Sequence, residues 1–99
     1  MHRHLLHHHT ASEKGKCWLL IGDITGWIGA FVLLGAYLLV SFDLIGAQSI
    51  AYQLMNIIGA VGLMILALAR RATPSVFVNA IWIIIGLVAI VGIISAISL

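Results

Sequence analysis

Charged side chains almost disappear from this chain after residue 23. Beyond Asp23 the only charged residues are Asp43, Arg70 and Arg71, and residues 72–99 carry none. A charge at the centre of a bilayer costs about 2.5–3.5 kcal/mol on insertion scales, so uncharged runs between charged residues indicate membrane-spanning segments. Only 8% of the 99 residues are charged, whereas soluble domains average about 25%. The sequence therefore predicts an all-α membrane protein.

A domain of three transmembrane helices is expected over residues 18–99. Its helices are predicted at about residues 23–41, 49–69 and 74–95. At about 1.5 Å per residue the first is about 28 Å long, close to the thickness of the hydrocarbon layer. We expect Asp23 to cap the first helix and Pro74 to lie in the first turn of the third. Short connections make neighbouring helices antiparallel, which predicts an up-down-up three-transmembrane-helix bundle.

Residues 1–17 form a separate polar segment. All five histidines of the chain lie in its first part, "MHRHLLHHHT". Such tracts can bind metal, but they also occur as tags, and we favour a disordered, His-rich leader or tag over a native metal site. Cys17 is the only cysteine, so the chain cannot form an internal disulfide.

The basic residues predict the orientation of the helices. Lys14 and Lys16 precede the first span, and Arg70 and Arg71 separate the second from the third. Because cytoplasmic loops carry the excess of Lys and Arg, we expect the N terminus and the second turn inside and the C terminus outside.

Small residues in the spans indicate close helix packing. The first span carries Gly22, Gly26 and Ala30 at spacings of four, and the third carries Gly86, Ala89, Gly92 and Ala96. Helices in lipid associate through such small residues because their backbones can approach each other closely. We therefore expect both stripes to face neighbouring helices.

Five polar or aromatic residues within the spans are the candidate site. They are Tyr37, Tyr52, Asn56, Asn79 and Trp82. Tyr52 and Asn56 share one helix face, and Trp82 lies one turn beyond Asn79. An amide in hydrocarbon needs a partner, so both asparagines are expected to point inward. Two interpretations remain open, namely hydrogen bonds between helices and contact with a ligand. Counted from Pro74, Asn79 lies about 7–8 Å along its helix, which puts it off the midplane.

Three stretches resemble the three-helix repeat of the SemiSWEET sugar transporters and the wider PQ-loop group. They are "GWIGAFVLLGAYLLV", "SIAYQLMNIIGAVGL" and "PSVFVNAIW". The matching positions are Gly26, Ser49, Tyr52, Gly59, Pro74 and Asn79. Leu39 and Val40 stand where that group carries its Pro-Gln pair. The chain also resembles a group of small uncharacterised bacterial three-helix membrane proteins, and the membrane segment ahead of some lipid A disaccharide synthases.

The resemblance implies a fold, a location and a function. It implies a SemiSWEET-like triple-helix bundle in the bacterial inner membrane, paired as a homodimer with the cavity between two parallel copies. In that arrangement Asn79 would reach a small neutral solute, and the other four candidate residues would shape the cavity. The alternative is a non-transporting scaffold, partner subunit or lipid-binding module.

Other classes of function are not expected. The spans contain no nucleophile–base pair, no spaced metal cluster and no glycine-rich phosphate loop, so we predict neither an enzyme nor a cofactor. The chain lacks a basic face for nucleic acid. The expected partners are the lipid bilayer, a second copy of the chain, and a small neutral solute or a lipid.

Overall fold

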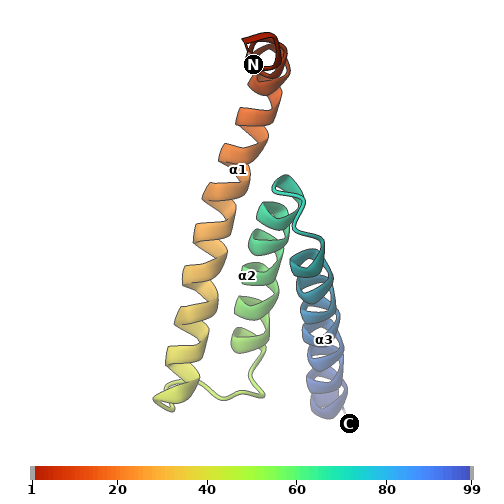
Figure 1. Ribbon diagram of the computed structural model, residues 1–99. Helices are drawn as coiled ribbons and strands as arrows, with labels where there is room; N and C mark the ends of the chain where they lie inside the picture. Colours follow the sequence, from red (N-terminus) through yellow and green to blue (C-terminus); the bar gives the residue numbers. More distant parts are fainter. Residues whose placement is uncertain (1, 99) are drawn as a thin grey trace.

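The computed structural model describes the backbone of residues 2–98 and the side chains of residues 13–97. It contains three α-helices, α1 (His2–Ser41), α2 (Ile50–Ala69) and α3 (Thr73–Ser98), and no strand within the described backbone. Neighbouring helices are antiparallel, and in the view of Figure 1 α1 runs down, α2 up and α3 down. Three segments are long and apolar enough to cross a membrane, namely Glu13–Ser41, Ile50–Ala69 and Thr73–Ile97. The predicted all-α fold with three spanning helices is confirmed.

The beginnings of α2 and α3 lie close to the predicted positions. Ser49 caps α2, because its hydroxyl oxygen accepts a hydrogen bond from the backbone N–H of Tyr52 at 3.2 Å. The α3 helix begins at Thr73, with Pro74 in the first turn. Proline is tolerated there because the first-turn N–H groups have no partner within the helix.

The first helix differs from the prediction. It begins at His2 rather than near Asp23. It therefore runs through the segment 1–17, which was predicted to be disordered and of which only Met1 lies outside the described backbone. The segment contains no proline to interrupt the helix. Figure 1 shows α1 continuing well past the end of α2. Asp23 therefore does not cap a helix, and that prediction is wrong.

The three helices lie in a row with α2 in the middle. Helix α2 contacts both α1 and α3, whereas no described Cα atom of α1 lies within 8 Å of one in α3. Figure 1 shows α2 between the other two helices. The arrangement leaves parts of α2 that neither helix covers, and Leu54, Ile58 and Val61 are exposed there.

Helices α1 and α2 touch through their backbones. Gly22 and Gly26 are buried as expected, but Gly29 is buried in place of Ala30, which is half-buried. A methyl group added at Gly62 of α2 would meet the backbone oxygen of Thr25, and would lie 3.2 Å from the Cα atom of Gly29. Only glycine allows the two helices to approach this closely.

The glycine stripe on α3 packs at one position. Gly86 is buried, and a methyl group there would lie 2.6 Å from the Cγ1 atom of Ile57. At Gly92 no neighbouring atom lies within 4 Å, and Ala96 is exposed. Within this chain only Gly86 of the glycine stripe packs against another helix, because α3 contacts α2 alone.

The first two helices end with the same backbone motif. The Leu44 N–H donates to the Leu39 carbonyl at 2.8 Å, and the Ala72 N–H donates to the Ala67 carbonyl at 2.8 Å. Such bonds define a Schellman ending, in which one residue takes a left-handed conformation. That residue is Asp43 after α1, with a φ of 58°, and Arg71 after α2, with a φ of 55°. Charged residues thus occupy positions that glycine would adopt with less strain.

Candidate functional site

A groove of about 500 Å³ lies between α1 and α3, with α2 as its floor. Its lining residues are Leu33, Tyr37, Tyr52, Asn56, Val78, Asn79 and Trp82. All five candidate residues from the sequence are therefore brought together, although they come from three helices. The groove lining contains no charged side chain.

Asn56 lies at the floor of the groove and is only 7% exposed. Its Nδ2 group donates to the backbone carbonyl of Tyr52 at 2.8 Å, one turn earlier in α2. Its Oδ1 atom accepts from the indole N–H of Trp82 at 3.2 Å, which links α2 to α3. This side chain makes the hydrogen bond between helices that the sequence suggests as one interpretation.

The other polar groups of the groove have hydrogen-bonding capacity to spare. The Nδ2 group of Asn79 donates to the Ser75 carbonyl at 2.9 Å. Among the described residues, the Asn79 Oδ1 atom and the hydroxyl groups of Tyr37 and Tyr52 have no partner. Tyr37 is 66% exposed. The groove therefore combines three free polar groups with an indole side chain, a combination that suits a neutral polar ligand.

A second hollow continues from the groove toward the basic end of the helices. It has a volume of about 340 Å³ and is lined by Leu63, Leu66, Ala67, Arg70, Ala72, Ser75 and Asn79. Asn79 lines both hollows and so lies at a level between Asn56 and Leu63. Figure 1 shows α3 beginning part-way along α2. This offset places Asn79 beside the middle of α2, and its depth in the membrane stays a prediction.

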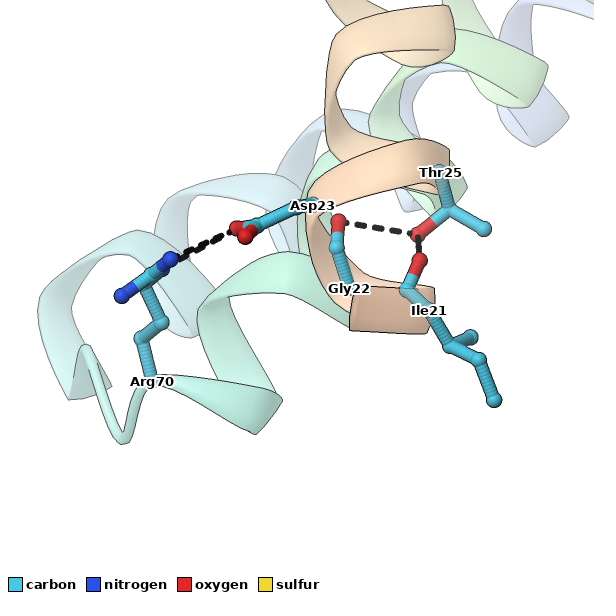
Figure 2. Close-up of polar contacts among 5 residues, drawn as sticks. All are labelled: Ile21, Gly22, Asp23, Thr25 and Arg70. Carbon is cyan, nitrogen blue, oxygen red and sulfur yellow. Dashed lines mark hydrogen bonds and ion pairs between the residues drawn. The ribbon is translucent and has the colours of Figure 1, made fainter. Parts of the chain in front are cut away.

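An ion pair joins α1 to α2 near Arg70 and Arg71, at the end of α2. The Arg70 Nη2 group lies 2.7 Å from the Asp23 Oδ1 atom, and its Nε–H donates to the same oxygen at 3.3 Å (Figure 2). The two side chains are 53% and 42% exposed. This pair was not predicted from the sequence, where the only signal for it is that the two charges fall at the same predicted membrane surface. Arg71 is exposed and has no partner among the described side chains.

Metal ligands do not gather in the described part of the chain. Within residues 13–97, no group of three or more His, Cys, Asp or Glu side chains could hold a metal ion. The histidine side chains of the N-terminal tract lie outside the described side chains, so the alternatives for that tract remain predictions.

The outer surface of the helices defines the class of protein. Large apolar side chains such as Trp27 and Phe31 are each 66% exposed, whereas the fully buried apolar residues are Ala36 and Ala60. Together with three spanning helices, this surface defines a small multi-pass membrane protein. The chain belongs to a protein family of uncharacterised function whose profile matches residues 22–96. No curated protein and no solved structure is significantly similar to it.

Proposed function

We propose that this chain is one half of a homodimeric facilitator for a small neutral solute. The observation that carries the proposal is the uncharged groove, in which Tyr37, Tyr52 and Asn79 keep free hydrogen-bonding groups beside Trp82. A charged solute would find no counter-charge in this lining. The likeness of Pro74–Trp82 to the third helix of the SemiSWEET transporters supports the same proposal.

The open side of the groove supports a homodimer. Helices α1 and α3 do not meet among the described residues, so a single copy exposes Tyr37 and Asn79 to the surrounding lipid. Polar groups without partners are costly in hydrocarbon. A second, parallel copy would place its own groove against this one, and the two grooves together would form a larger polar cavity. Two-fold pairing is the commonest closed assembly of identical chains.

The hollow beyond Asn79 supports passage of a solute along the helices, and not only its binding in the groove. The groove and the 340 Å³ hollow share Asn79 and together extend from Tyr52, near the start of α2, to Arg70 at its end. In the proposed orientation, in a bacterial inner membrane, Arg70 faces the cytoplasm and the C terminus lies outside. A solute that leaves the groove would therefore meet the Arg70–Asp23 pair at the inner end.

Uptake into proteoliposomes tests this proposal. Purified protein is reconstituted and offered a panel of radiolabelled neutral solutes of graded size, with charged solutes for comparison. We expect uptake of a neutral solute, and its loss in Asn79→Ala. Gln48→Ala is the matched control, because Gln48 is an exposed amide in the connection before α2. Equal uptake by Asn79→Ala and Gln48→Ala would remove Asn79 from the site, and no uptake of any solute would reject transport.

A second candidate function is a non-transporting module that binds lipid. The supporting observation is Arg71, an exposed cation at the membrane surface that no described side chain neutralises. Such a side chain gains about 1 kcal/mol near anionic headgroups. If no solute is transported and Arg71→Gln weakens retention of anionic lipid in native mass spectrometry, this function replaces the first.

A further inference from the structure

One side-chain hydrogen bond joins α3 to α2 within the membrane-spanning segments. It runs from the indole N–H of Trp82 to Asn56 Oδ1 at 3.2 Å. The other half of the Asn56 amide is held by its own helix, through the bond to the Tyr52 carbonyl at 2.8 Å. That local bond fixes which atom faces α3, because only the oxygen remains available to accept from Trp82.

The same bond lies between two hollows. The 500 Å³ groove is on one side, and a smaller hollow of about 140 Å³ is on the other. Both are lined by Tyr52, Asn56 and Trp82. Gln53, Ile85 and Gly86 complete the smaller one. Trp82, which is 47% exposed, therefore borders both spaces.

We infer that Asn56 is a positioning residue rather than a ligand-binding one, and that its bond to Trp82 is a latch between α2 and α3. While the bond is closed, Trp82 keeps the smaller hollow apart from the groove. When it opens, the ring is free to turn and the two spaces join. The role of the groove rests on the proposed function, whereas the bond and its effect on Trp82 do not.

The chemistry of the latch determines what can open it. Both of its polar atoms lie in a region surrounded by hydrocarbon, where an unpaired indole N–H or amide oxygen is costly. A hydroxyl group can accept from the indole and donate to the Asn56 oxygen at the same time. A solute that carries such a group replaces both partners, but a purely apolar one leaves both unpaired. The latch therefore favours solutes that both donate and accept.

Indole N–H resonances of the full chain in detergent micelles test the latch. Trp18 and Trp27 are replaced by phenylalanine, so that Trp82 is the only tryptophan. We expect Asn56→Leu to shift the Trp82 indole proton upfield and to speed its exchange with water about fivefold, as the loss of one hydrogen bond predicts. Gln53→Leu is the matched control, because Gln53 lines the same hollow but bonds to the Ala47 carbonyl. It should leave both values unchanged.

The parent protein provides a second measurement if Asn56→Leu fails to fold. With Trp27 retained, the Trp82 indole proton is expected downfield of that of Trp27, whose indole N–H has no partner among the described residues. Identical indole spectra of Asn56→Leu and its parent would overturn the latch, as would a Trp82 proton upfield of that of Trp27. A solute-uptake failure would reject transport and leave these spectra unaffected.

Discussion

Replacing Gly62 by alanine is expected to force α1 and α2 apart. The new methyl group would meet the backbone oxygen of Thr25, and would lie 3.2 Å and 3.3 Å from the Cα and N atoms of Gly29. Ordinary contacts of such a carbon are 3.4–4 Å long. All three neighbours are backbone atoms, so no side chain can rotate away and the helices themselves must move.

The size of the effect follows from two opposing terms. Overpacking costs about 1–3 kcal/mol, and a contact with backbone belongs in the upper part of that range. Alanine regains about 1 kcal/mol over glycine within a helix. The expected net loss of stability is about 1–2 kcal/mol. At Gly92 no atom lies within 4 Å, so Gly92→Ala keeps only the favourable helix term and is the matched control.

Reversible unfolding in mixed micelles, in which the fraction of SDS is raised and helicity is followed by circular dichroism, measures this difference. Gly26→Ala should fall between the other two variants, because its new methyl group would meet side-chain atoms of Leu66 rather than backbone. If Gly62→Ala proved as stable as Gly92→Ala, a backbone contact between α1 and α2 at Gly62 would be refuted.

Three further predictions concern the ends of the helices. Asp23→Asn and Arg70→Gln should each cost about 0.2–1 kcal/mol, because the pair is largely exposed. The double variant Asp23→Arg/Arg70→Asp, which exchanges the two charges, should recover most of the lost stability in the same unfolding assay. Asp43→Gly should stabilise the protein by about 1 kcal/mol by relieving its positive φ of 58°, whereas Asp43→Ala should give no such gain. In intact cells, an impermeant maleimide should spare Cys17 but label Ala47→Cys in a Cys17→Ala background, and the opposite pattern would invert the proposed orientation.

The uncharged run between charged residues predicted the second helix well, and the five candidate residues lie together. The helix predicted at about residues 49–69 is observed at Ile50–Ala69, because Ser49 can cap its start and the charges of Arg70 and Arg71 mark its end. The five candidate residues share a groove because polar side chains in hydrocarbon must turn toward protein, wherever the helices lie. The separate role of each residue could not be predicted from the sequence, because the bond from Trp82 to Asn56 depends on how α3 is offset along α2.

The order of the helices could not be predicted in the same way. In water, an apolar face indicates which side of a helix is buried. In lipid, the solvent is as apolar as the side chains, so a stripe such as Gly86–Gly92 looks the same whether a helix or lipid covers it. The start of α1 was predicted wrongly because Asp23 marks where the uncharged run begins, whereas the helix itself begins at His2.

The two helix contacts of α2 differ in kind, and this difference indicates which helix can move. Against α1, the glycines at 29 and 62 bring backbones together over a rigid surface, and the Asp23–Arg70 pair ties their ends. Against α3, the contact includes Gly86 beside the Ile57 side chain and one side-chain bond from Trp82, and no ion pair joins the described parts of the two helices. Hydrogen bonds of this type within membranes contribute about 0.6–2 kcal/mol, which thermal fluctuations and a competing solute can overcome. Any change in groove volume should therefore come from α3, while α1 and α2 move as a unit.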